Sequence, residues 1–169
     1  MRKLSVAFSA AALGAVATPA LAADLTVSVE IPRLTAASYH RPYVAVWIER
    51  PEATTALRTL AVWYETSNVE EGKDWLKDMR TWWRRGGRAL TMPADGVSSA
   101  TKAPGRHAVT VPGARLRDLP AGDYVLVVEA ARELGGRESV RVPFRWGTAN
   151  TARATGTDEL GAVSVTVTR

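Results

Sequence analysis

The sequence contains no cysteine and only two histidines, His40 and His107. The absence of cysteine excludes disulfide bonds, thiolate metal ligands and a lipid-modified cysteine. Neither histidine stands in a recognised catalytic or metal-ligand spacing, and the chain has no GxSxG or HExxH motif. The sequence therefore gives no support to a hydrolase, and we predict no catalytic residue and no metal ligand.

Long apolar runs are also absent after the N-terminus. Arg2 and Lys3 precede an apolar segment at residues 4–17, and Ala20-Leu21-Ala22 has the small-residue spacing that a signal peptidase accepts. No later segment approaches the run of about 20 apolar residues that a membrane-spanning helix needs. We therefore expect a cleaved signal peptide over residues 1–22, a single mature domain over residues 23–169, and a periplasmic location.

A strong excess of charge of one sign is lacking as well. The formal net charge of +5 falls by two, to +3, when Arg2 and Lys3 are removed with the leader. Acidic and basic residues are mixed along the mature chain, whereas strong nucleic-acid binders gather positive charge on one face. We expect no nucleic-acid partner.

Short apolar or alternating segments are abundant, and they are typical of β-strands. They lie at residues 25–31, 43–50, 57–64, 107–111, 124–131, 139–146 and 163–167. Pro143 favours an edge position for its strand, and the run from Pro120 to Tyr124 resembles a tyrosine corner. The pattern predicts a mainly-β fold, an immunoglobulin- or fibronectin-like antiparallel β-sandwich.

Residues 73–88, KDWLKDMRTWWRRGGR, depart from the strand pattern. At about 100° per residue, five apolar side chains fall on one side of a helix: Trp75, Leu76, Met79, Trp82 and Trp83. The sequence predicts one short amphipathic helix over about residues 73–85, inserted in the sandwich with its tryptophans inward. Gly86 and Gly87 are expected to end it with a positive φ.

The loop that follows contains Asp95–Thr101, DGVSSAT. This segment resembles the acceptor for covalent flavin attachment in exported redox proteins, Asp-x-x-Ser/Thr-Gly-Ala-Ser/Thr, in which a dedicated transferase joins the final hydroxyl to the phosphate of FMN. Ser99 replaces the glycine, and a serine with positive φ there would be strained by about 1 kcal/mol. A polar loop that carries no cofactor has the same composition, so both interpretations stay open.

Several segments together resemble one uncharacterised family of predicted periplasmic proteins, catalogued as domain of unknown function 2271. They are residues 41–49, 60–64, 73–84, 95–105 and 120–133. The resemblance implies association with FMN transferases and with membrane-bound reductases that carry PepSY domains. It therefore implies an accessory role in exported flavin-based electron transfer.

Two functions follow as hypotheses. In the first, the protein is an electron carrier with FMN attached covalently, and the candidate cofactor-binding residues are Thr101, Asp95, Ser98, Trp82, Trp83 and Arg84. The adjacent indoles, or Trp75, would stack on the isoalloxazine, and Arg84, Arg85 or Arg88 would counter the charge of the phosphate or of the reduced flavin. In the second, the protein is a cofactor-free immunoglobulin-like module that docks on a membrane protein or binds a metal or a peptide.

Overall fold

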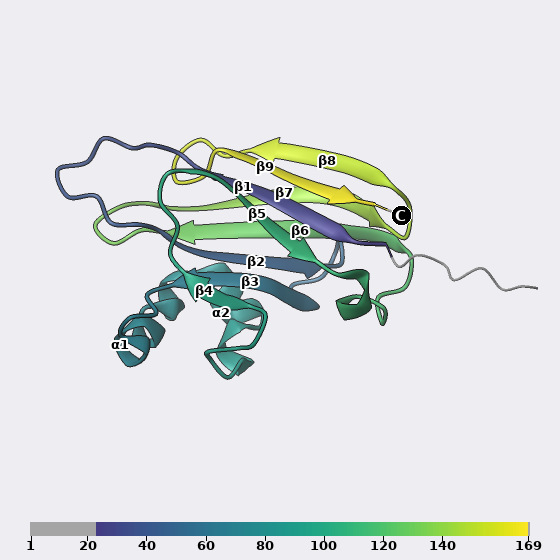
Figure 1. The fold of residues 1–169 in the computed structure, drawn as a ribbon, viewed down its shortest axis with the longest axis horizontal. Helices are drawn as coiled ribbons and strands as arrows, with labels where there is room; N and C mark the ends of the chain where they lie inside the picture. The colour runs from purple at the N-terminus through teal and green to yellow at the C-terminus, as the bar shows by residue number, and fades with distance from the viewer. Residues whose placement is uncertain (1–22, 169) are drawn as a thin grey trace, which may run out of the picture.

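The computed structural model describes residues 23–168, so the predicted signal peptide lies outside the described part. Nine strands form two sheets (Figure 1). The four-stranded sheet has the order β5-β1-β9-β8, with strands β1 (Leu25–Ile31), β5 (Gly105–Val111), β8 (Asn150–Thr155) and β9 (Ala162–Val167). The five-stranded sheet has the order β4-β3-β2-β6-β7, with strands β2 (Tyr43–Glu49), β3 (Arg58–Tyr64), β4 (Ser98–Ala100), β6 (Gly122–Ala131) and β7 (Arg137–Trp146).

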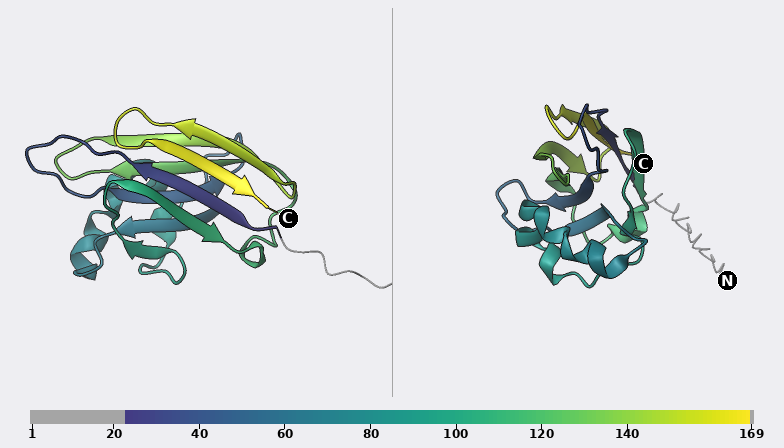
Figure 2. Two further views of the ribbon diagram at one scale, coloured as in Figure 1. Left: turned by 45° about the horizontal axis from the view of Figure 1, so that its top comes forward. Right: turned by 90° about the vertical axis from the view of Figure 1, so that its left-hand side faces the viewer.

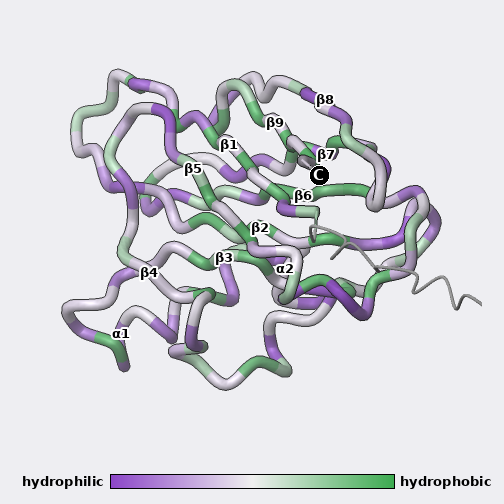
Figure 3. Tube along the Cα trace, turned by 45° about the vertical axis from the view of Figure 1, so that its right-hand side comes forward, coloured by the Kyte–Doolittle hydropathy of each residue, from purple (hydrophilic) through white to green (hydrophobic). Residues whose placement is uncertain are grey.

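The main core lies between the two sheets. In β1 every second residue is fully or almost fully buried, and β7 alternates in the same way from Val140 to Trp146. The edge strand β8 has no fully buried residue and carries hydrophilic side chains (Figure 3). The period-two pattern read from the sequence thus corresponds to a sheet with one face in the core.

Strands β2 and β6 differ, because nearly all of their residues are buried. One face of these strands contacts the other sheet, and the opposite face lies under a layer of short helical segments (Figure 2). These segments are α1 (Val69–Asp74), η1 (Leu76–Asp78), α2 (Arg80–Arg85) and η2 (Gly87–Ala89). Leu76, Met79 and Trp82 form a second apolar cluster with the outer face of β2, β3 and β6.

The predicted continuous helix over residues 73–85 is wrong. The chain forms two α-helices of six residues each, joined by a 3-10 turn, and Met79, with ψ of 70°, interrupts the helical backbone. Trp75 caps the first helix and is 53% exposed, so it does not belong to the inward face. The expected positive φ at Gly86 is also absent, since its φ of 170° is extended. Contacts with the sheet override an uninterrupted helical period in so short a segment.

Two strands were not expected from the sequence. The loop after the helical layer contains β4, and the polar segment after Trp146 contains β8. Neither has an alternation of large apolar residues, because both are edge strands. β4 also pairs with β3 in parallel, an exception to the antiparallel pattern.

The mainly-β class and the sandwich are confirmed, whereas an immunoglobulin-like strand order is not. Two local predictions are borne out. The buried Tyr124 hydroxyl donates to the Pro120 carbonyl oxygen at 2.8 Å, which is the bond of a tyrosine corner. The strand that contains Pro143, β7, is at the edge of its sheet.

Candidate functional site

The ends of four strands meet at one end of the five-stranded sheet. The register places Ala100 beside Tyr64, and Tyr43 beside Ala131. β2 pairs with both β3 and β6, so these residues form a row across the sheet. In Figure 1 the loop before β2, the β6–β7 turn and α1 all lie at this end. Residues distant in the sequence therefore surround one space.

That space is a groove of about 910 Å³. One side comes from the segment after β3 and the helical layer, and the other from the loop before β2 and the β6–β7 turn, with the ends of β2 and β6 between them. The lining residues are Tyr39, His40, Arg41, Tyr43, Glu65, Ser67, Asn68, Glu71, Trp75, Asp78, Thr101, Ala131, Arg132, Glu133 and Leu134. Acidic and amide groups predominate on the helical side, whereas both arginines and His40 come from the opposite side.

Thr101 lies directly after β4 and lines this groove. Its backbone N–H donates to the Tyr64 carbonyl oxygen at 3.2 Å, which extends the β3–β4 pairing by one residue. The residue is partly exposed. The sheet therefore fixes the backbone of a threonine that lines the groove.

Ser99 is not strained. It lies within β4 opposite Trp63, and among residues 23–168 the only non-glycine residue with a positive φ is Leu134. The cost anticipated for a serine in place of glycine therefore does not arise in this backbone.

Trp75 is a large aromatic side chain of the helical layer that lines the groove and remains exposed. Tyr43 lies across from it on β2 and contacts Tyr64 edge to face, with ring centroids 6.4 Å apart. Burial raises the pKa of the Tyr43 hydroxyl. The groove thus has aromatic surface near Thr101 as well as charged groups.

Hydrogen bonds order the charged groups around the groove. Glu65 accepts from the Ser67 hydroxyl and backbone N–H, both at 2.6 Å, and these bonds lower the pKa of its carboxyl. Arg132 donates two hydrogen bonds to the buried Glu159, and this pairing raises the pKa of the guanidinium. His40 Nδ1 lies 3.3 Å from a carboxylate oxygen of Glu133.

The structure separates the other predicted site residues from Thr101. Asp95 is exposed in the turn before β4, and Ser98 accepts a hydrogen bond from the Ala94 N–H at 2.9 Å. Neither lines the groove. Ser98 thus closes the turn before β4, and neither residue contacts the same space as Thr101.

Trp82, Trp83 and Arg84 lie away from the groove too. Trp82 is fully buried and its indole N–H donates to the Thr59 hydroxyl at 3.1 Å. Thr59 and Tyr64 are five residues apart on β3, a distance of about 17 Å along a strand. The hypothesis that Trp82 stacks on a cofactor is therefore wrong, and Trp83 and Arg84 are likewise not groove residues.

Tyr39, Arg41, Tyr43 and Arg132 were not predicted as site residues. No local motif marks them, because only strand pairing brings them into the groove that Thr101 lines. A weak signal existed: residues 41–43 and 132 lie in two of the segments that carry the family resemblance.

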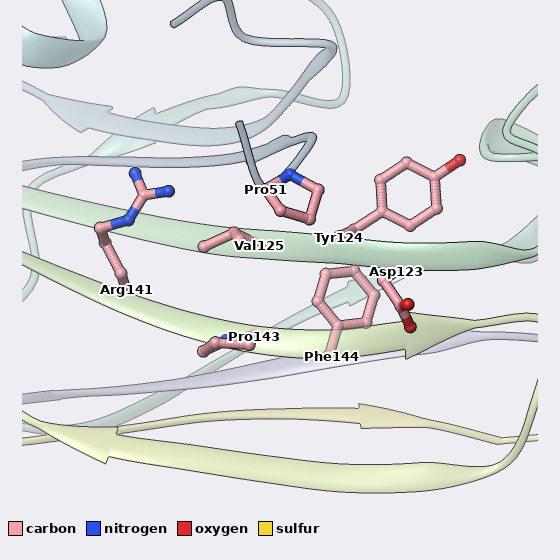
Figure 4. A pocket seen from close by; sticks show the side chains of 7 residues that line it. All are labelled: Pro51, Asp123, Tyr124, Val125, Arg141, Pro143 and Phe144. Carbon is pink, nitrogen blue, oxygen red and sulfur yellow. The ribbon is translucent and has the colours of Figure 1, made fainter. Parts of the chain in front are cut away.

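A smaller hollow of about 550 Å³ lies between β6 and β7, near the turn after β2 (Figure 4). It is lined by Pro51, Asp123, Tyr124, Val125, Arg141, Pro143 and Phe144. None of the predicted site residues lines it. Its surface is mainly apolar, and the Tyr124 hydroxyl is already bonded to Pro120.

No group of three or more histidine and acidic side chains that could hold a metal ion occurs among residues 23–168. Within that same range, no helix has the length and hydrophobicity needed to cross a bilayer.

A model of a known protein family matches most of the chain. The model of the family described as "Predicted periplasmic protein (DUF2271)" matches residues 24–162. The chain belongs to this family. The resemblance noted from the sequence is thereby confirmed, and the family description agrees with the predicted periplasmic location. No curated protein and no solved structure matches the chain.

Proposed function

We propose that this periplasmic protein is an electron carrier in which FMN is joined covalently to the hydroxyl of Thr101. The observation that supports the proposal most directly is the position of Thr101. The residue that matches the final hydroxyl of the attachment pattern faces a groove of about 910 Å³, and the same groove exposes Trp75.

The residues of the groove fit the parts of FMN. Thr101 supplies the acceptor oxygen, and Arg41, which lines the same groove, offsets part of the negative charge of the ligand. Trp75 offers an exposed indole on which a planar ring can stack. A stacked flavin ring would cover this exposed indole. Such a role gives a reason for a large apolar side chain at the surface.

Attachment requires an activated flavin phosphate. In the proposed step the Thr101 oxygen forms a new P–O bond to the FMN phosphorus of a flavin adenine dinucleotide. The pyrophosphate P–O bond breaks, AMP leaves, and the hydroxyl proton passes to a base of the transferase. The partners are thus an FMN transferase and, as electron donor, a membrane-bound reductase with a PepSY domain. When bound, the flavin would supply electron transfer, and the protein would supply position and surroundings.

Mass spectrometry tests the attachment. The full chain, exported from a bacterial host together with an FMN transferase, is expected to carry one FMN on the peptide that contains Thr101. Thr101→Ala should abolish the added mass, and Thr101→Ser should retain it because the acceptor hydroxyl remains. Ser99→Ala is the matched control that should keep the modification, because Ser99 does not match the attachment pattern.

A colourless wild-type protein without added mass would contradict the proposal. That result would favour the cofactor-free module that docks on a membrane protein. Added mass that persists in Thr101→Ala would place the attachment at another residue and would also overturn the assignment.

A further inference from the structure

Arg132 occupies an unusual position in the wall of the groove. Its side chain is 9% exposed, and Nε and Nη2 donate to the two carboxylate oxygens of Glu159 at 2.8 and 2.9 Å. The third nitrogen, Nη1, is buried and has no hydrogen-bond partner within the described chain. A buried donor without a partner is unfavourable, because it has lost its hydrogen bonds to water and gained none in return.

Tyr39 shares this property. Its ring covers the guanidinium, with the Arg132 Cζ 5.7 Å from the ring centroid, and its buried hydroxyl also has no partner among residues 23–168. Burial raises the pKa of this hydroxyl, which keeps it protonated as a donor. Two donors without partners therefore lie on neighbouring side chains at the groove wall.

Their distance from the attachment point is set by the sheet. Thr101 follows β4 and Arg132 follows β6, and the strands β3 and β2 lie between these two. Three strand spacings amount to about 14 Å. A ligand fixed by its phosphate at Thr101 and extended across the strand ends would present its far end to Arg132 and Tyr39.

The far end of FMN is the pyrimidine edge of the isoalloxazine, which has two carbonyl acceptors. Uptake of two electrons and one proton leaves negative charge on this edge, so a donor there favours the reduced form. The Glu159 carboxylate offsets the charge of Arg132 for any group that does not contact it directly. A change in the reduction potential of the flavin therefore depends on a direct hydrogen bond from Nη1.

We propose that Arg132 Nη1 and the Tyr39 hydroxyl bind the carbonyl edge of the isoalloxazine and raise its reduction potential. Both are positioning residues for the proposed carrier, and the assignment rests on the flavin attachment at Thr101. Arg41, exposed on the same side of the groove, adds positive charge.

Redox titration of the flavin-loaded protein with dithionite, followed by absorbance, tests this assignment. Tyr39→Phe removes only the hydroxyl, and Arg132→Lys keeps the charge but removes Nη1. Both variants are expected to have a more negative midpoint potential than wild type. Arg145→Lys is the control, because Arg145 is an exposed arginine of β7 that pairs with Asp123 and does not line the groove.

Mass spectrometry on the same samples separates the two proposals. If FMN is attached but neither variant shifts the potential, the assignment of Arg132 and Tyr39 is overturned and the carrier function stands. If wild type carries no FMN, both fail. Should Arg132→Lys not fold, Tyr39→Phe decides the question alone, since it leaves the pair with Glu159 in place.

Discussion

Two tryptophans seven residues apart illustrate how the same side chain serves different purposes. Trp82 is fully buried between α2 and β3, whereas Trp75 is 53% exposed at the groove. Their spacing would bring them to one side of an uninterrupted helix. The break at Met79 rotates them apart. Trp82 thus contributes to stability, and Trp75 remains available to a ligand.

Alanine substitutions should separate these roles. We expect Trp82→Ala to lower the free energy of unfolding by about 3–5 kcal/mol, as for other buried aromatic residues, and Trp75→Ala to change it by about 0.5 kcal/mol or less. Urea denaturation measures both. On the flavin-loaded protein, Trp75→Ala should also increase flavin fluorescence, because a stacked indole quenches it. Equal losses of stability would contradict this division.

At the scale of elements, α1 is held close to the end of β3 by Gly72. This buried glycine has no room for a side chain: a Cβ would lie 2.0 Å from the Glu65 carbonyl oxygen. Gly87 has a similar role, since a Cβ there would lie 2.6 Å from the Trp82 ring. These close approaches let the helical layer contact the sheet directly and form one side of the groove.

Gly72→Ala therefore tests the docking of α1. Alanine would stabilise a free helix by about 1 kcal/mol relative to glycine, but here the clash with the backbone should outweigh that gain. We expect a net loss of about 1–3 kcal/mol in the free energy of unfolding, typical of overpacked sites. Glu70→Ala, on the exposed side of α1, is the control in the same urea titration. A more stable Gly72→Ala variant would show that α1 is not held this closely.

At the scale of the whole molecule, buried carboxylates join the helical layer to the sheet. Glu129 on β6 accepts hydrogen bonds from the Thr81 and Trp82 N–H groups at 3.0 and 2.7 Å. Glu49 on β2 accepts from Trp47, Arg85 and Arg141, which links β2 to α2 and β7. Both carboxylates are fully buried. Each would carry a large desolvation cost without these partners.

The buried Glu49 should make the free energy of unfolding depend on pH. Burial by itself raises the pKa of this carboxyl, but hydrogen bonds from Arg85, Trp47 and Arg141 outweigh burial and hold the pKa below its ordinary value of 4.5. The unfolded chain therefore binds the proton more readily than the folded one. The stabilisation is present above about pH 4.5 and is lost as the pH falls below that value.

Urea denaturation between pH 7 and pH 3 measures this loss. Glu49→Gln should be less stable than wild type at pH 7, because Arg85 loses its charged partner. Its stability should also fall less steeply below pH 4.5. Glu138, whose pKa is lowered by three backbone N–H groups despite burial, keeps part of the acid dependence in both proteins. An unchanged acid slope in Glu49→Gln would contradict the role assigned to Glu49.

Local patterns were sufficient for much of the fold. The range 25–31 was predicted as observed, and the tyrosine corner at Tyr124 and the edge position of Pro143 followed from turn and strand chemistry. β4 and β8 were missed because edge strands bury few large side chains. The helical period of residues 73–85 predicted one continuous helix, but contacts with the sheet determine the backbone conformation there.

The amino-acid sequence by itself determined the mainly-β class, the family and the threonine with the flavin-attachment pattern, since each depends on neighbouring residues along the chain. Only the tertiary structure decided what surrounds Thr101. Strand pairing brings Tyr43 and Arg132 to the same end of the sheet, and a break in the helical layer turns Trp75 toward them. Such proximity depends on hydrogen bonds between distant segments, which no local pattern records.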